Sequence, residues 1–285
     1  MNELDFRLTL ERFNLSPEGY RKVRKGVQKR IIRHMAALRC PTTAAYLERL
    51  DADPVAQNEA RRLMDVSISR FFRDGPVWKI LEEEHLPLLI REHPGGLRVW
   101  SAGCALGQEV FSFEILWAIL AGKTAAMPPL ELWATDVNPD YLERAIEGIY
   151  PAGALARVPA EARARFFHPV GNARFRAIDS LREGIRWRVH DLSVDAPPAR
   201  DFQVIFFRNN LLTYYRDEIV EAALPAIADS LVPGGVLVIG RKERLPDFLK
   251  GFTPHAAAAS LYKKQGSGIF FESVEMRALL EIKDC

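Results

Sequence analysis

Two glycines, Gly103 and Gly107, separate a β-type run at residues 97–100 from a stretch with helical periodicity. This order is typical of the first strand–turn–helix unit of an open α/β sheet, in which ligands bind outside the carboxyl ends of the strands. Glycine lets the backbone approach a ligand closely, and the following helix offers free N–H groups to the ligand's polar end. Many α/β folds use such a turn for packing alone, so the residues around it must decide its role.

An acidic residue, Asp136, ends the next predicted strand, in the sequence Ala134-Thr135-Asp136. A carboxylate at this place can accept hydrogen bonds from both ribose hydroxyls of an adenosine cofactor. Aspartate is also a common turn and helix-capping residue. The glycine turn one strand earlier favours the cofactor interpretation.

Two later strands also end in residues suited to a cofactor crevice. One ends in His190-Asp191-Leu192, where a carboxylate and an apolar side chain can border an adenine ring, and another ends in Arg208-Asn209. We expect one crevice here, because parallel strands bring their carboxyl ends to the same edge of a sheet. His190 either serves a structural role or acts as a base for an amine or hydroxyl acceptor.

The elements that position these residues predict a doubly wound α/β fold, with a mostly parallel sheet of the Rossmann-like type. The predicted strands are Leu97–Trp100, Leu130–Thr135, Ile185–Val189, Val204–Phe207 and Val236–Ile239. Helical stretches follow Gly107, Asn138 and Tyr215. Near the end, the runs LYKKQ and IFFES flank Gly266-Ser267-Gly268 and predict a terminal antiparallel hairpin.

Three units are expected along the chain. Residues 1–82 predict a small all-helical N-terminal domain, and residues 83–285 predict the cofactor-binding catalytic domain. A polar, irregular insertion at about 151–184 is expected to form a small subdomain, although no strand alternation is evident in it.

The composition restricts the class of protein. With 285 residues, 48% of them hydrophobic, the chain can bury one sizeable core. A formal net charge of +2 argues against a nucleic-acid partner, and no apolar run approaches the ~18 residues of a membrane span. The N-terminus lacks an apolar secretory segment, and Cys40, Cys104 and Cys285 are widely separated. We expect a cytoplasmic, metal-free protein.

The N-terminal region carries a basic face beside an apolar helical stripe. The stripe consists of Tyr20, Val23, Val27, Ile31, Met35 and Leu38. The basic residues beside it are Arg21, Lys22, Arg24, Lys25, Lys29, Arg30 and Arg33, with no acidic residue among them. This face is either a solvated helix surface or a docking surface for an acidic partner, because clustered charge steers association.

Five motifs, in order along the chain, resemble those of the CheR family, the S-adenosylmethionine-dependent methyltransferases of bacterial chemotaxis that esterify receptor glutamates. They are Ser69-Arg70-Phe71-Phe72-Arg73-Asp74, the glycine turn within Arg98 to Ser112, Ala134 to Asn138 with the later Gly148-Ile149-Tyr150, Phe207-Arg208-Asn209, and Pro233-Gly234-Gly235. The resemblance implies S-adenosyl-L-methionine as cofactor, S-adenosyl-L-homocysteine as product, and no metal.

The resemblance also implies roles for individual residues. It implies cofactor contacts by Arg73, Gly103, Glu109, Asp136, Asp191, Leu192 and Asn209. Glu109 would attract the cofactor's α-ammonium group, or it stabilises the positive end of the helix dipole. Arg73 would bind the cofactor carboxylate or orient the acceptor carboxylate, and it also fits an ordinary interdomain ion pair.

The chain departs from the family pattern mainly on the acceptor side. The family's double acid after the second glycine is Gln108-Glu109 here, and its Gly-His-Ser-Glu pattern after the fifth strand is Gly240-Arg241-Lys242-Glu243. The tyrosine that the family places beside the transferred methyl aligns with Thr213, and Tyr214 or Tyr215 either replaces it through a one-residue shift or simply packs. The candidate catalytic residues are Arg73, Thr213 and Tyr214.

The chemistry that the resemblance implies is simple. A glutamate acceptor has a pKa near 4.3 and needs no general base, whereas a lysine amine, with a pKa near 10.4, must first lose a proton. The expected function is therefore O-methylation of glutamate side chains in a chemoreceptor-like protein, whose acidic helical segment would dock near Arg21 to Arg33. The alternatives are a changed acceptor, either a small molecule or a peptide, and a sensor or scaffold that binds the cofactor without turnover.

Overall fold

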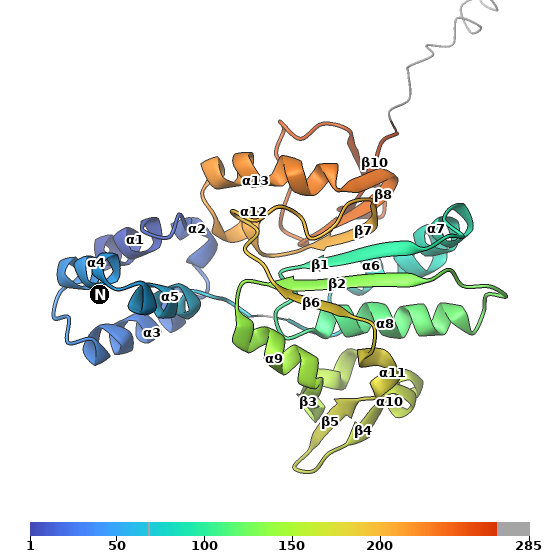
Figure 1. Cartoon of the computed structure of the whole chain (residues 1–285), viewed down its shortest axis with the longest axis horizontal. Helices are drawn as coiled ribbons and strands as arrows, with labels where there is room; N and C mark the ends of the chain where they lie inside the picture. The colour runs from blue at the N-terminus through green and yellow to red at the C-terminus, as the bar shows by residue number, and fades with distance from the viewer. Residues whose placement is uncertain (68, 267–285) are drawn as a thin grey trace, which may run out of the picture.

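The computed structural model describes residues 1–67 and 69–266, and its centre is a twisted sheet of seven strands (Figure 1). The strand order is β6-β2-β1-β7-β8-β10-β9. The strands are β1 (Leu97–Ala102), β2 (Leu130–Asp136), β6 (Arg186–Val189), β7 (Phe202–Phe207), β8 (Leu231–Ile239), β9 (Phe252–His255) and β10 (Ala258–Lys264). The first five are parallel to one another, which confirms the doubly wound fold.

The terminal antiparallel pair is present, but it is made by other residues than those predicted. Strand β10 contains the predicted LYKK arm and pairs antiparallel with both β8 and β9. Its hairpin partner is thus the preceding segment, Phe252–His255. The predicted second arm, IFFES, lies outside the described residues.

Helices cover both faces of the sheet and give it two apolar cores. On one face lie α6 (Gly75–Ile80), a short π-helix (Leu81–His85), α7 (Leu86–Glu92) and α8 (Gln108–Ala121). On the other face lie α12 (Leu211–Tyr214) and α13 (Asp217–Asp229). A further helix, α9 (Pro139–Glu147), follows β2 and contacts both β2 and β6 (Figure 1).

The N-terminal helices form a unit with a core of its own, beside the sheet in Figure 1. They are α1 (Glu3–Glu11), α2 (Pro17–Tyr20), α3 (Arg24–Ala37), α4 (Thr43–Ala52) and α5 (Pro54–Leu63). The predicted apolar stripe faces this core, since Tyr20, Val27 and Ile31 are at most 2% exposed. Val77 and Trp78, in contrast, pack in the core of the sheet. We therefore propose a domain boundary within residues 64–74, earlier than residue 82.

The inserted segment contains a second, three-stranded sheet in the order β3-β5-β4. Its elements are β3 (Ile149–Pro151), a 3₁₀-helix (Ala152–Arg157), α10 (Ala160–Phe166), β4 (Phe167–Pro169), β5 (Arg174–Ala177) and α11 (Asp179–Arg182). Strands of three or four residues are too short to show apolar–polar alternation, which explains why the sequence did not reveal them.

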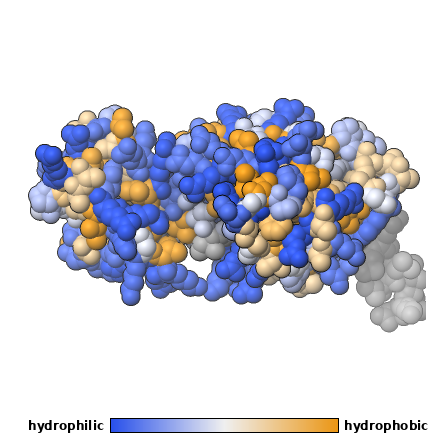
Figure 2. Space-filling view, turned by 90° about the horizontal axis from the view of Figure 1, so that it is seen from below, coloured by the Kyte–Doolittle hydropathy of each residue, from blue (hydrophilic) through white to orange (hydrophobic). Residues whose placement is uncertain are grey.

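The helical unit docks on α12, the short helix after β7. The N–H of Ser16 donates to the carbonyl of Tyr214 at 2.8 Å, and the N–H of Arg216 donates to the carbonyl of Asn14 at 3.1 Å. The rings of Tyr20 and Tyr214 lie 5.0 Å apart. Hydrophilic side chains cover much of the face in Figure 2, over both the helical unit and the rest of the chain. In the described ranges, no helix combines the length and apolar character needed to cross a membrane.

Glu114 in α8 gives the fold a predicted pH dependence. Burial raises the pKa of Glu114 to about 8. Near neutral pH the folded protein therefore keeps this carboxyl group protonated, whereas the same carboxyl group is ionised in the unfolded chain. Stability should therefore fall between pH 6.5 and 8, by roughly 1 kcal/mol per pH unit. We expect Glu114→Gln to remove this slope in urea unfolding curves. The exposed Glu221→Gln should retain it, and a wild-type curve without the slope would contradict the assignment.

Candidate active site

The turn after β1 forms the floor of the site and requires glycine at two positions. Gly103 has φ +77°, and a Cβ there would lie 2.8 Å from the side-chain nitrogen of Asn210. Gly107 has φ +81°, and a Cβ there would lie 2.9 Å from the Cβ of Ala145. The N–H groups of Gly103 and Cys104 both donate to the carbonyl of Thr135 at 2.8 Å, which fixes the turn against β2.

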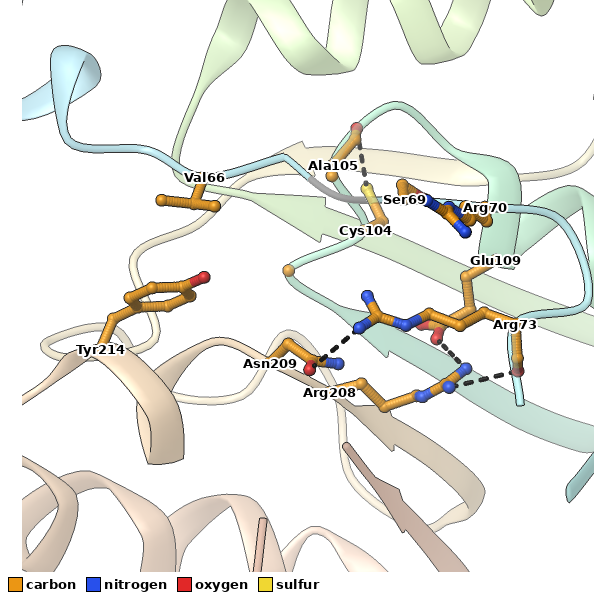
Figure 3. A pocket seen from close by; sticks show the side chains of 11 residues that line it. Val66, Ser69, Arg70, Arg73, Cys104, Ala105, Glu109, Arg208, Asn209 and Tyr214 are labelled. Carbon is orange, nitrogen blue, oxygen red and sulfur yellow. Dashed lines mark hydrogen bonds and ion pairs between the residues drawn. The ribbon is translucent and has the colours of Figure 1, made fainter. Parts of the chain in front are cut away.

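A cleft opens above this turn, between the linker from α5 to α6 and the end of β7 (Figure 3). Its lining consists of Val66, Ser69, Arg70, Arg73, Gly103, Cys104, Ala105, Glu109, Arg208, Asn209 and Tyr214. Five of the residues predicted from the sequence are thus brought together here. They are Arg73, Gly103, Glu109, Asn209 and Tyr214.

Arg208 is the buried cation at the base of the cleft. Only 4% of its side chain is exposed, and its guanidinium contacts two carboxylates, Asp74 and, at 3.2 Å, Glu109. It also donates to the carbonyl of Arg73 at 3.2 Å (Figure 3). Arg208 belongs to a predicted strand end and to a family motif, but it is not among the residues for which the resemblance implies a role.

Glu109 and Arg73 both lie next to Arg208 (Figure 3). Glu109, in the first turn of α8, accepts a hydrogen bond from the hydroxyl of Ser101 at 2.7 Å besides its ion pair with Arg208. Arg73 donates to the side-chain oxygen of Asn209 at 3.4 Å (Figure 3). Its Nε lies 3.9 Å from Asp74. The cleft thus offers both a guanidinium and a carboxylate to a ligand that carries both charges.

Asp136 is 8% exposed and lies behind the turn rather than in the cleft lining. Its two oxygens accept hydrogen bonds from the N–H groups of Ala105 at 2.8 Å and Asn138 at 2.9 Å. Burial raises its pKa to about 6, and these two hydrogen bonds act in the opposite direction. Each carboxylate oxygen has a second lone pair for a ligand hydroxyl. Asn138 also donates to Asp65 of the linker at 2.8 Å.

The three residues that follow β6 do not line the cleft. Asp191 accepts from the N–H of Ser193 at 2.9 Å and so shapes its own turn. Leu192 is 8% exposed and packs in a core cluster. His190 is 2% exposed, with its Nε2 at 2.9 Å from the carbonyl of Ala196. This geometry favours the structural role for His190 over that of a base.

The structure distinguishes the three residues considered for the acceptor side. The hydroxyl of Thr213 donates to Glu243, and that of Tyr215 accepts from Arg61. Tyr214 alone lines the cleft, and burial raises its pKa, so its hydroxyl keeps its proton at neutral pH. The position that aligns with the family tyrosine is therefore tied to Glu243, whereas its neighbour Tyr214 lines the cleft.

These groups fit a nucleoside that carries an amino acid with a free carboxylate and a free ammonium group. Arg73 can bind a carboxylate and Glu109 an ammonium, and Asp136 keeps lone pairs for a ribose diol. Gly103 and Ala105, in the turn after β1, also line the cleft. The charges of the cleft therefore correspond to those of S-adenosylmethionine.

Comparison with known proteins agrees with this chemistry. Residues 67–259 match the family described as CheR methyltransferase, SAM binding domain. A chemotaxis protein methyltransferase of Listeria innocua is 31% identical over 219 residues, which cover 77% of this chain and 81% of that protein. Chemotaxis protein methyltransferase 2 of Pseudomonas aeruginosa is 29% identical over 223 residues, covering 76% of this chain and 77% of the relative. The chain therefore belongs to the CheR family of S-adenosylmethionine-dependent methyltransferases.

Proposed function

We propose that this methyltransferase converts glutamate side chains of a protein into methyl esters. The observation that carries the proposal is the absence of an available base. Among the described residues that line the cleft there is no histidine or lysine, and Glu109 is held by Arg208 and Ser101. A carboxylate acceptor is already ionised at neutral pH and needs none.

The protein's own contribution is then alignment and exclusion of water. When bound, S-adenosylmethionine supplies an electrophilic methyl group on a sulfonium whose sulfur leaves as a neutral thioether. Arg73 holds a carboxylate at the mouth of the cleft, and Asn209 orients its guanidinium. Tyr214 closes the side formed by α12 and, being protonated, can donate a hydrogen bond to the acceptor. Most of the rate acceleration then comes from holding the reacting atoms about 3 Å apart in a site without water.

The acceptor is proposed to be an acidic helical segment of a chemoreceptor-like protein. Relatives named chemotaxis protein methyltransferases support a protein substrate. Arg21, Lys22 and Lys25 line a second cleft that shares Val66 with the first. Two predicted members of the basic face are already engaged, because Arg24 pairs with Glu3 and Arg30 donates to main-chain carbonyls. We therefore place docking on the exposed Arg21, Lys22, Lys25, Lys29 and Arg33.

A methyl-transfer assay tests this function. The protein is incubated with methyl-labelled S-adenosylmethionine and cell extract, and the products are treated with mild base. Label on protein that is released as volatile methanol supports carboxyl methylation. The triple variant Lys22→Gln, Lys25→Gln, Lys29→Gln should lower this labelling roughly tenfold while binding S-adenosylhomocysteine normally.

Other outcomes identify the rival functions. Base-stable label on protein would contradict ester formation. Label confined to small molecules would indicate a changed acceptor, which the placement of Thr213 against Glu243 favours as the second candidate. Cofactor binding without any transfer would indicate a sensor or scaffold.

A further inference from the structure

The side chain of Glu243, the fourth residue after β8, accepts three hydrogen bonds. One carboxylate oxygen accepts from the N–H of Asn209 at 3.0 Å and from the N–H of Gly240 at 2.6 Å. The other oxygen accepts from the hydroxyl of Thr213. Glu243 thus joins the ends of β7 and β8 to the start of α12.

The contact with Asn209 holds an uncommon backbone conformation in place. Asn209 has φ +54°, in the left-handed region that asparagine tolerates at some cost. Such a conformation persists only where the surroundings fix it. The bond from its N–H to Glu243 does so, and the Asn209 side chain then reaches the guanidinium of Arg73.

The contact with Thr213 fixes the adjoining cleft residue. Thr213 and Tyr214 are consecutive in α12, a helix of four residues. A helix this short has little stability of its own, so side-chain contacts must hold it. Because Thr213 is tied to Glu243, Tyr214 is directed into the cleft.

The loop around Glu243 is closely packed at Gly240. A Cβ at Gly240 would lie 2.6 Å from the Glu243 oxygen and 2.9 Å from the side chain of Asn209. Burial raises the pKa of Glu243, and the hydrogen bonds from Thr213, Asn209 and Gly240 act in the opposite direction. The side chain at position 243 therefore needs one oxygen that accepts from the N–H groups of Asn209 and Gly240. It also needs a second polar atom that can hydrogen-bond to the hydroxyl of Thr213.

We propose that Glu243 is a positioning residue for methyl transfer, acting through Asn209 and Tyr214 to set the two walls of the cofactor cleft. Its role is geometric rather than electrostatic. The amide of glutamine can make the same contacts, with its oxygen on the N–H groups of Asn209 and Gly240 and its nitrogen donating to Thr213. This inference rests on the cleft being the cofactor site and is independent of the acceptor's identity.

The test is binding of S-adenosylhomocysteine, measured by calorimetry together with the melting temperature. Glu243→Leu should weaken binding about ten- to hundredfold. Loss of its hydrogen bonds should displace Asn209 and Tyr214, and a small displacement of positioning residues can cost up to about a hundredfold. Glu243→Gln should bind within about threefold of wild type. Glu131 provides the matched control. It also accepts hydrogen bonds, from Trp133 and Arg98, but it lies in the first half of β2 and does not line the cofactor cleft. Glu131→Leu should lower the melting temperature and leave binding unchanged.

A second variant covers the case in which Glu243→Leu does not fold. Gly240→Ala should push the carboxylate away from Asn209 and weaken binding, whereas Gly153→Ala, with no atom within 4 Å of the added Cβ, should not. Wild-type affinity in Glu243→Leu or Gly240→Ala would overturn the positioning role. So would a Glu243→Gln variant that binds as weakly as Glu243→Leu. A wild-type protein that binds no S-adenosylhomocysteine would instead overturn the cofactor assignment on which the role rests.

Discussion

Replacing Arg208 by methionine is expected to destabilise the protein by about 3–5 kcal/mol and to abolish cofactor binding. The side chain of Arg208 is 4% exposed, and those of its partners Asp74 and Glu109 are 20% and 15% exposed. Without the guanidinium, the largely buried carboxylate of Glu109 loses its ion pair, and that of Asp74 keeps only the distant Nε of Arg73, at 3.9 Å. Urea unfolding and calorimetric titration with S-adenosylhomocysteine measure the two effects.

A surface arginine of the same sheet provides the comparison. Arg98 in β1 pairs with Glu131, and 44% of its side chain is exposed. Because exposed ion pairs contribute little, Arg98→Met should cost less than about 1 kcal/mol and leave binding intact. Equal stability of Arg208→Met and Arg98→Met would contradict the claim that the ion pairs of Arg208 with Asp74 and Glu109 hold the base of the cleft.

Gly19→Ala is expected to displace the helical unit from the sheet and to lower methyl transfer about tenfold or more. A Cβ at Gly19 would collide with the carbonyl oxygen of Thr213 and lie 3.2 Å from the Cα of Tyr214. The collision is relieved only when α2 and α12 move apart, which changes the surroundings of Tyr214 in α12. Overpacking of this kind costs about 1–3 kcal/mol, which a lowered melting temperature should report.

Gly26→Ala is the matched control for this substitution. Gly26 lies in α3 of the same helical unit, and no atom lies within 4 Å of its added Cβ. Alanine should stabilise the helix there by about 0.5–1 kcal/mol and leave activity unchanged. Equal activity in the Gly19 and Gly26 variants would show that docking on α12 does not position the site.

The sheet and the cofactor turn were predictable from the sequence because their signals are local. The five parallel strands are apolar runs between turn residues, and each observed strand overlaps its predicted range. Gly103 and Gly107 were recognisable because a positive φ at a strand–helix turn demands glycine. The strands of the inserted segment were missed because three or four residues carry too little periodicity.

The remaining parts of the site depend on contacts between distant segments. The alignment alone could not choose between Thr213 and Tyr214, because the choice is made by Glu243, thirty residues later in the chain. The family's Gly-His-Ser-Glu pattern is altered here at Arg241 and Lys242, whereas Gly240 and Glu243, which are retained, make the contacts. Likewise, no sequence pattern indicates that Arg24 and Arg30 are engaged within the helical unit.

The most direct test of the account is a calorimetric titration of the Asp136→Ala variant with S-adenosylhomocysteine, beside wild type. Asp136 holds the turn through Ala105 and keeps acceptors for a ribose diol, so we predict binding by wild type and a loss of about a hundredfold or more in the variant. Asp179→Ala, which removes a surface partner of Arg182, should bind as wild type does. Equal affinity of Asp136→Ala and wild type would contradict the claim that the cofactor lies where the parallel strands end.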